Sequence, residues 1–223
     1  MESQLTTIRS IDPETAVNDT LAMTELSGFP TRKQLRDLKR REIVRCATVK
    51  FGTEGYENVT LEAIATELGV TKAALYNYCS SKNDLLMQCY ELGMDRLVDA
   101  VETAMAGTGS AAERLAAGLK AYIVTMLRPD MQYLWSYTRP MVTSGDKRSV
   151  LDSRDKLDVM FRNMLNAGIS DGSLRADLDP KLASLVILGA ANWVGIWYRK
   201  GGGKSPSEIG AEVTGEALRG YLA

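Results

Sequence analysis

Apolar residues recur every three or four positions from residue 31 onward, and polar residues fill the positions between them. This spacing is typical of helices that bury one face, and no segment shows the strict alternation of a half-buried strand. Glycines, prolines and capping residues divide the pattern into segments. The sequence therefore predicts an all-α fold of about nine helices, over about 34–51, 61–68, 72–78, 82–105, 111–128, 131–143, 148–167, 180–199 and 206–222.

Capping residues sharpen several of these boundaries. A serine followed three residues later by an acidic side chain is the pattern of a capping box, and it occurs at Ser81, Ser110 and Ser205. Asp179 precedes Pro180, and proline is favoured at the first position of a helix. We expect Gly168 to stop the helix over 148–167.

The composition excludes several classes of site. The chain has no histidine, which removes Ser-His-Asp and Cys-His catalysis as well as histidine-based zinc sites. Cys46, Cys79 and Cys89 are too far apart to form a Cys-x-x-Cys pair, so neither a zinc ribbon nor a disulfide framework is expected. We therefore predict a protein that is not an enzyme, binds no cofactor or metal, and works in the reducing cytoplasm.

Charge is unevenly distributed along the chain. The net charge is −1, but residues 30–85 hold ten basic and seven acidic residues, whereas residues 1–29 are acidic. A basic surface on one face is enough to attract nucleic acid, whatever the charge of the whole chain. Residues 1–30 are poorly periodic and are expected to be an N-terminal tail.

The segment 61–78 has the pattern of a helix-turn-helix. Two short helices meet at Gly69, where the turn needs a left-handed residue, and Thr60 and Thr71 stand at the two N-caps. A shared core is expected from Ile64, Leu68, Val70, Leu75 and Tyr78. In such a motif the second helix enters the major groove of DNA.

Residues 40–85 resemble the DNA-binding domain of the tetracycline-repressor (TetR) family. The resemblance rests on the run Gly69-Val70-Thr71-Lys72-Ala73-Ala74-Leu75-Tyr76-Asn77-Tyr78 followed by Ser81-Lys82. Two residues depart from the family pattern: Cys79 stands where phenylalanine is usual, and Ala73 where glycine is frequent. The resemblance implies a homodimeric transcription factor, usually a repressor, that binds a palindromic operator and responds to a ligand. It implies DNA contacts by Thr60, Thr71, Lys72, Ala73, Tyr76, Asn77, Tyr78 and Lys82.

The C-terminal part resembles one branch of this family, through Asn192-Trp193, Trp197-Tyr198-Arg199, a glycine-rich loop and Ser205-Pro206-Ser207-Glu208-Ile209. Members of that branch sense acyl-coenzyme A thioesters, so the effector is expected to be hydrophobic or of the acyl-CoA type. Methionine and aromatic side chains between non-ideal helices can hold such a ligand. The candidate pocket residues are Tyr90, Met94, Tyr122, Met126, Tyr133, Trp135, Tyr137, Arg139, Met160 and Met164.

The helix over 180–199 is the candidate dimer interface. Gly189, Ala190 and Ala191 offer a close-packing strip beside Trp193 and Trp197. Paired with 206–222, the helix suits a two-fold four-helix contact. The interface candidates are Leu185, Leu188, Gly189, Asn192, Trp193, Ile196 and Trp197. Its uncharged run, Leu182 to Tyr198, is 17 residues long, which is short of the ~20 that a membrane span needs, so no membrane is expected.

Two domains follow the predicted tail: a helix-turn-helix domain over 31–85 and a ligand-binding and dimerisation domain over 86–223. The alternative is a helical small-molecule-binding or interaction protein that does not act on DNA. A salt-dependent DNA-binding measurement separates the two readings.

Overall fold

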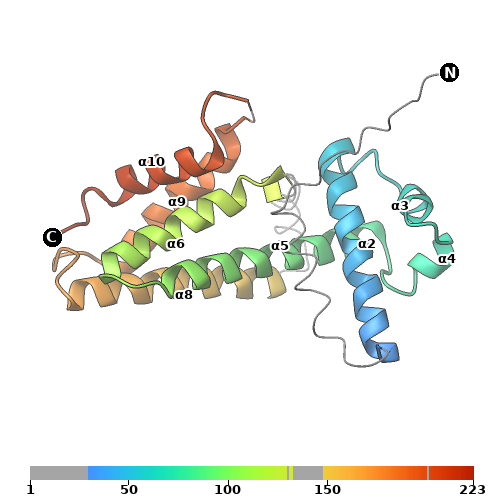
Figure 1. The fold of residues 1–223 in the computed structure, drawn as a ribbon, viewed down its shortest axis with the longest axis horizontal. Coiled ribbons are helices and arrows are strands. Elements are labelled where there is room, and N and C mark those ends of the chain that lie inside the picture. Colours follow the sequence, from blue (N-terminus) through green and yellow to red (C-terminus); the bar gives the residue numbers. More distant parts are fainter. Residues whose placement is uncertain (1–29, 130, 133–147, 200) are drawn as a thin grey trace, which may run out of the picture. The chain divides into compact units, whose positions relative to one another are not determined.

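The computed structural model describes residues 30–129, 131–132, 148–199 and 201–223, and in the third of these ranges it describes side chains from Arg154 onward. The described residues form eight helices and no strand, which confirms the all-α prediction (Figure 1). The predicted tail up to residue 29 and most of the segment 131–143 lie outside them. The helices are α2 (Arg32–Glu54), α3 (Leu61–Glu67), α4 (Lys72–Leu75), α5 (Lys82–Met105), α6 (Ala111–Met126), α8 (Arg148–Ser170), α9 (Pro180–Trp197) and α10 (Pro206–Leu218).

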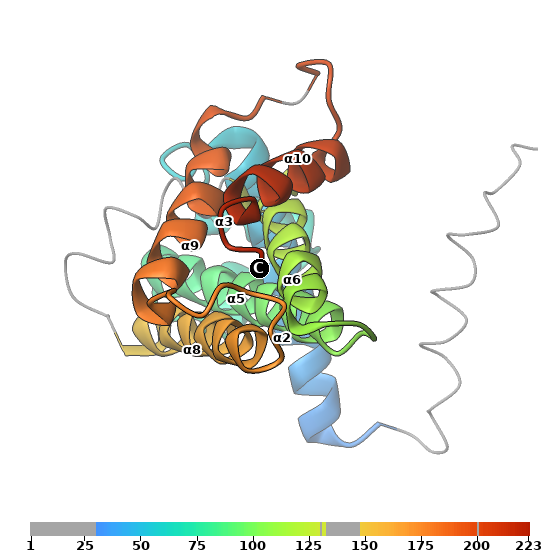
Figure 2. The ribbon, with the colours of Figure 1, turned by 90° about the vertical axis from the view of Figure 1, so that its left-hand side faces the viewer.

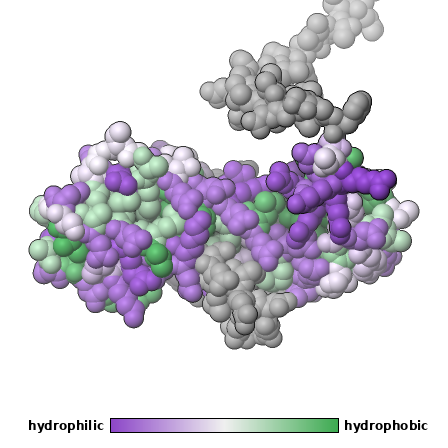
Figure 3. Space-filling model, turned by 90° about the horizontal axis from the view of Figure 1, so that it is seen from below, coloured by the Kyte–Doolittle hydropathy of each residue, from purple (hydrophilic) through white to green (hydrophobic). Residues whose placement is uncertain are grey.

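The chain divides into two compact units, Met1–Arg41 and Glu42–Ala223. The described part of the first unit is the opening of α2, whose residues are exposed. It carries the densest basic run of the chain, drawn as hydrophilic surface in Figure 3. The basic residues are Arg32, Lys33, Arg36, Lys39, Arg40 and Arg41.

The second unit is built around α6, which contacts α5, α8, α9 and α10 (Figures 1 and 2). Leu115, Leu119 and Ile123 of this helix are fully buried. Gly118 lets α5 approach closely, because a Cβ there would lie 2.5 Å from the Met105 methyl group. The same hydrophobic core extends to the residues of α3 and α4, so one continuous core supports the whole unit.

The predicted capping boxes are confirmed at two of three sites. Ser110 and Ser205 each bond reciprocally with the glutamate three residues later. Ser81 accepts a hydrogen bond from the Asp84 amide, but the Asp84 carboxylate accepts from the amide and hydroxyl of Ser80 instead of closing the box. The shorter aspartate side chain meets the residue before the cap.

The prediction that Gly168 stops a helix is wrong. Helix α8 continues through it to Ser170, and Gly172 takes the left-handed conformation instead, with φ 76°. A side chain at Gly168 would collide with Leu174, because its Cβ would lie 2.5 Å from the leucine Cδ1. Gly168 therefore makes room for packing and does not end the helix.

Asp171 ties the turn after α8 to the start of α6. Its carboxylate accepts hydrogen bonds from the Ala111 amide at 2.8 Å and from the Ser173 amide at 2.9 Å. Hydrogen bonds from Ser173 and Ala111 lower the pKa of Asp171. Because the folded pKa is depressed, this stabilisation is present above the unfolded value of 3.8 and is lost as pH falls through the folded pKa.

We expect Asp171→Ala to lower the midpoint of thermal unfolding by about 2–4 °C at neutral pH, since one N-terminal amide of α6 loses its partner. The difference from the wild type should shrink as the pH approaches the folded pKa of Asp171. Asp177→Ala, which removes a surface ion pair with Arg175, is the control. Equal midpoints for Asp171→Ala and the wild type at pH 7 would contradict the role of this contact.

Candidate functional site

Helices α3 and α4 meet at a tight turn. Thr60 caps α3 by accepting a hydrogen bond from the Ala63 amide at 3.1 Å, and Thr71 caps α4 in the same way from Ala74. Gly69 has φ +64°, a left-handed conformation that favours glycine. The Val70 amide then donates to the Ala65 carbonyl at 2.9 Å and closes the turn.

The predicted core of this helix pair is confirmed in part. Ile64 and Leu75 are fully buried, while Leu68 and Tyr78 are half-buried and pack against the core. The prediction for Val70 is wrong, because 42% of it is exposed. Its backbone serves the turn and its side chain faces outward.

Helix α4 presents an exposed face. Thr71, Lys72, Ala73, Tyr76 and Asn77 are all exposed, and Tyr76 is 49% accessible. The helix is shorter than the expected 72–78, because the chain leaves the α-helix after Leu75 and continues in turns that keep Asn77 outside. These side chains combine a cation, hydroxyls and an amide, the groups that bind phosphates and base edges.

Lys72 is held by an ion pair in the free protein. Its ammonium lies 2.7 Å from the Glu62 carboxylate of α3, and this hydrogen bond raises the pKa of Lys72. Both side chains are exposed. The contact is therefore weak and open to exchange with another anion.

The other predicted contact residues lie at the edges of this face. Thr60 is exposed at the start of α3. The Lys82 ammonium lies 4.3 Å from the centre of the Tyr56 ring and donates to the Glu57 carbonyl at 3.3 Å. Cys79 is buried, and its thiol lies 3.7 Å from the Leu75 carbonyl, so it acts as a small core residue.

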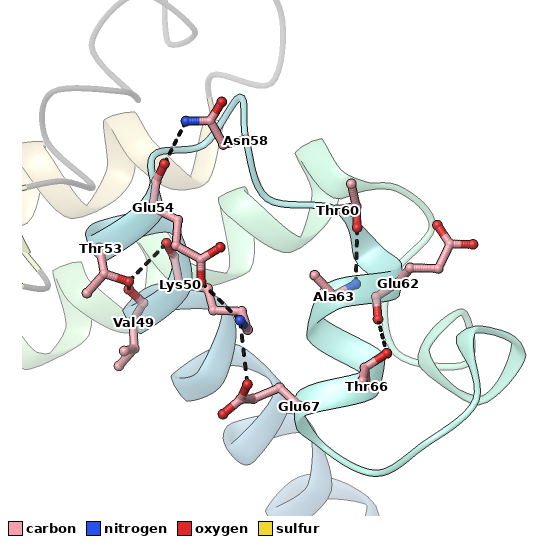
Figure 4. Close-up of polar contacts among 10 residues, drawn as sticks. All are labelled: Val49, Lys50, Thr53, Glu54, Asn58, Thr60, Glu62, Ala63, Thr66 and Glu67. Atoms are coloured by element: carbon pink, nitrogen blue, oxygen red, sulfur yellow. Dashed lines mark hydrogen bonds and ion pairs between the residues drawn. The ribbon is translucent and has the colours of Figure 1, made fainter.

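Lys50 attaches α3 to α2. Its ammonium lies 3.0 Å from the Glu54 carboxylate on its own helix and 3.5 Å from that of Glu67 on α3 (Figure 4). These contacts raise the pKa of Lys50, through the hydrogen bond to Glu54 first. The contact fixes the far end of α3, which leads into the turn at Gly69.

A cavity of about 460 Å³ lies among α5, α6, α8 and α9. It is lined by Met94, Tyr122, Arg154, Leu157, Asp158, Leu185, Leu188, Gly189, Asn192, Trp193 and Ile196. The Tyr122 hydroxyl donates to the Asn192 side-chain oxygen at 2.5 Å, and the Tyr122 ring packs edge-on against Phe161. Asp158 accepts from the Ser184 hydroxyl at 2.7 Å and pairs with Arg162.

Two of the ten predicted pocket residues, Met94 and Tyr122, line this cavity. Tyr90, Met126 and Met164 are buried in the core without lining it, and Met160 is half-buried against the core. The remaining predictions, Tyr133, Trp135, Tyr137 and Arg139, lie outside the described residues. The sequence analysis did not identify Arg154, Leu157 and Asp158 as pocket residues. Their i, i+3 and i+4 spacing places them on one face of α8, which is the signal that could have found them.

Helix α9 exposes a continuous apolar face. Leu182, Leu185, Val186, Gly189, Ala190, Trp193, Ile196 and Trp197 follow helical spacing and are all exposed. Trp193 is 61% accessible, and a side chain added at Gly189 would meet nothing within 4 Å. Of the interface candidates, Leu188 and Asn192 are half-buried and line the cavity. Four residues of the exposed face, Leu185, Gly189, Trp193 and Ile196, line the cavity as well.

Two further tests bear on the site. Among the described residues, α9 is the helix that is long and apolar enough to cross a membrane by length and composition. Within the same part of the chain, no group of three histidine, cysteine or acidic residues could hold a metal ion.

Comparison with protein families matches both parts of the chain. A model described as bacterial regulatory proteins of the tetR family covers residues 43–89. A second, described as the tetracyclin repressor-like C-terminal domain, covers residues 108–221. Together they include the helix pair α3–α4, helix α9 and every residue that lines the cavity except Met94, which lies between the two matched ranges.

Individual proteins agree with these matches. The transcriptional repressor KstR2 of Mycobacterium tuberculosis (strain ATCC 25618 / H37Rv) is 25% identical over 185 residues, which cover 82% of this chain and 92% of the relative. A regulator of the TetR/AcrR family from Thermobifida fusca YX-ER1 has a crystal structure with a TM-score of 0.68, 30% identity and coverage of 83% and 99%. The structure of AibR with isovaleryl coenzyme A and operator DNA has a TM-score of 0.65 at 20% identity, covering 79% and 96%, and shows the same fold.

Proposed function

The chain belongs to the tetR family of bacterial regulatory proteins, and from this premise we propose that it represses transcription through a two-fold symmetric operator bound by α3, α4 and the start of α5. The observation that carries the proposal is the exposed face of α4, set by the left-handed turn at Gly69. A helix held in this way inserts its exposed side chains into the major groove.

Each predicted contact residue has a role that its surroundings support. The hydroxyl oxygens of Thr60 and Thr71 accept hydrogen bonds from backbone amides as helix caps. Their O–H groups can donate to a phosphate. Lys72 binds a phosphate in place of Glu62, and Asn77 reads a base edge. Ala73 lets the helix approach the groove, and Tyr76, Tyr78 and Lys82 contact the backbone around it.

The test is a titration of DNA from the region upstream of its gene at several salt concentrations. We expect Lys72→Ala to weaken binding about equally on all sequences and to reduce the slope of log affinity against log salt by about one. Asn77→Ala should cost about 1–3 kcal/mol and relax one base position. Unchanged affinity in both variants would contradict the assignment of α4 as the recognition helix.

Glu62→Gln should act in the opposite direction. It frees the Lys72 ammonium and removes a carboxylate near the phosphates, so operator affinity should rise by about two- to five-fold, the size of a surface ion pair. The rise should be smaller in a Lys72→Ala background, because the released partner is then missing. Glu102→Gln, on the ligand-domain part of α5, is the charge-matched control.

The dimer is proposed to form through the exposed face of α9, with α10 beside it. An apolar face of this extent and without charge is unusual on an isolated soluble chain and suits a second copy of itself. Burial in a dimer also accounts for the apolar character of α9 without a membrane. In this proposal residues 31–85 form the DNA-binding domain, residues 86–223 form the ligand-binding and dimerisation domain, and the protein works in the cytoplasm.

The effector is proposed to be a hydrophobic or acyl-CoA-type molecule that releases the operator. The cavity supports this proposal, because its volume of about 460 Å³ lies in the range of small-molecule sites and its walls are mainly apolar. The names of the relatives point the same way: KstR2 is a repressor, and AibR has been crystallised with isovaleryl coenzyme A.

A further inference from the structure

Helix α2 begins well before the range that matches the tetR family model. The match covers residues 43–89, whereas the helix starts at Arg32. The Gln34 amide donates to the Thr31 hydroxyl at 3.2 Å, and the Gln34 side-chain oxygen accepts from the Thr31 amide at 2.8 Å. This reciprocal pair is a capping box. Residues 32–41, which we call the basic arm, therefore form the first turns of a capped helix.

The charges of the basic arm act against its own helix. All of its residues are exposed, so burial does not compensate for repulsion between them. Arg32 and Lys33 stand in the first turn, where the helix dipole favours acidic side chains and none is present. Arg32, Arg36 and Lys39 follow one another at spacings of four and three, which place like charges side by side on one face. A polyanion bound to this face would relieve both penalties.

The cap of the basic arm is neutral. The capping boxes at Ser110 and Ser205 use Glu113 and Glu208 at the position that Gln34 holds here. Glutamine supplies the same acceptor oxygen as glutamate without the negative charge. Over residues 32–41 the sequence has six basic residues and one acidic residue, Asp37. The arm therefore has a defined helix start and little negative charge.

The cations of the basic arm are available to a ligand. Within the described residues, the side chains of Arg32, Lys33, Arg36, Lys39 and Arg41 make no ion pair. Many basic residues of the second unit differ in this respect and pair with a carboxylate: Arg45, Lys50, Lys72, Lys156, Arg162, Arg175, Lys204 and Arg219. Exposed cations of this kind neutralise the phosphates of a nucleic acid and release its counterions.

We propose that the basic arm is a second DNA-binding element, which holds the phosphates of double-stranded DNA without reading the sequence. Its contact face is formed by Arg32, Arg36 and Lys39. The arm is about 15 Å long, and a duplex carries one phosphate charge per about 1.7 Å of its axis, so acceptors outnumber the cations. Arginine suits them, because a guanidinium binds two phosphate oxygens in parallel. The inference rests on the proposed function for the identity of the polyanion, and it adds a contact outside the matched range 43–89.

The test is a triple variant of the full-length protein, Arg32→Gln with Arg36→Gln and Lys39→Gln. Glutamine removes the charge and keeps a high helix propensity. The upstream DNA and a random duplex of equal length are titrated at salt concentrations from about 50 to about 200 mM. Affinity at about 150 mM salt should fall ten-fold or more on both duplexes, and the slope of log affinity against log salt should become shallower by about two for each protomer. The ratio of the two affinities should stay within about two-fold, whereas Asn77→Ala changes this ratio.

Two further variants isolate the role of the arm. Lys120→Gln with Lys156→Gln and Lys204→Gln removes the same charge from exposed positions of the second unit, and it should change the slope by less than about half a unit. Gln34→Glu keeps the capping box but adds a negative charge to the arm. It should weaken binding to both duplexes by about two- to three-fold, while the midpoint of thermal unfolding stays equal or rises. Because the substituted arm residues are exposed, the helical circular dichroism of every variant should equal that of the wild type.

Wild-type affinity and slope in the triple variant overturn the inference, and so does an equal loss in the control with three substituted lysines. A loss confined to the upstream DNA contradicts a contact that is independent of sequence. Weaker binding to vesicles of phosphatidylserine and phosphatidylcholine, with unchanged DNA binding, would assign the arm to a membrane surface instead. Failure of the arm leaves the effect of Asn77→Ala on the affinity ratio in place. A loss through the arm with no effect of Lys72→Ala or Asn77→Ala would instead refute the role of α4 and keep the arm.

Discussion

Replacing Trp193 by aspartate should separate the dimer into monomers and strongly weaken operator binding. Trp193 is 61% exposed in the single chain and stands in the middle of the apolar face of α9, so the substitution leaves the fold of the monomer intact. In a two-fold dimer the same face of α9 from each copy lies in the interface. An aspartate at position 193 would therefore be a buried charge without a partner. Operator affinity should fall by about 10²–10⁴, because two linked half-sites become two independent ones.

Sedimentation at micromolar concentration measures the first effect, and the operator titration measures the second. Val159→Asp, an exposed apolar residue of α8 outside the proposed interface, is the matched control and should stay dimeric. The helical circular dichroism of both variants should equal that of the wild type. A Trp193→Asp protein that remains dimeric, or a wild type that is monomeric, would contradict the assignment of α9.

Local signals predicted where the capped helices begin, whereas the ends of α4 and α8 differ from the prediction. The boxes at Ser110 and Ser205 were predictable because the groups involved are three residues apart and need no information from elsewhere in the chain. The turn at Gly69 was predictable for the same reason. Gly168 was misread, because its role depends on Leu174, a side chain that returns to α8 from the following turn. A glycine that gives space and a glycine that turns the chain look alike in sequence.

The cavity was harder to predict, because burial depends on which residues lie opposite. Met126 and Met164 have the composition of a ligand site, yet they fill the core beneath it. Asn192 was expected at the dimer interface, and the structure turns its side chain inward to Tyr122. The exposed face of α9 and the cavity share Leu185, Gly189, Trp193 and Ile196, and periodicity alone does not say which element each side of the helix meets.

An acyl-CoA that enters the cavity should release the operator, and α5 is the element that connects the two sites. At its start, the Lys82 ammonium donates to the Glu57 carbonyl, and Gln88 donates to the Tyr78 carbonyl at 2.9 Å. Met94, six residues after Gln88, lines the cavity. Gln88 and Met94 are thus separated by about 9 Å along one rigid helix. A ligand that shifts α5 therefore moves the chain that follows α4.

We expect octanoyl-CoA, at saturation, to weaken operator binding by about 100-fold. This requires it to bind the DNA-incompetent state more tightly by about 2.7 kcal/mol, and coupling is reciprocal, so the operator must weaken octanoyl-CoA binding by the same factor. Both factors are measurable, by titrating the thioester into the protein–operator complex and by titrating the free and DNA-bound protein in calorimetry. Factors near one in both titrations would contradict release of the operator by an acyl thioester.

Gln88→Met tests the route through α5. It keeps the length of the side chain but removes the donor to the Tyr78 carbonyl and to the Asp84 carboxylate. Operator and thioester should each still bind, while release falls from about 100-fold to below ten-fold. Asn83→Ala, at an exposed position in the first turn of α5, should release normally and serves as the control. Full release by Gln88→Met would exclude this contact as the connection.

If octanol releases the operator and octanoyl-CoA does not, the effector is hydrophobic but not an acyl thioester, because the cavity then responds to apolar contact without the acyl group.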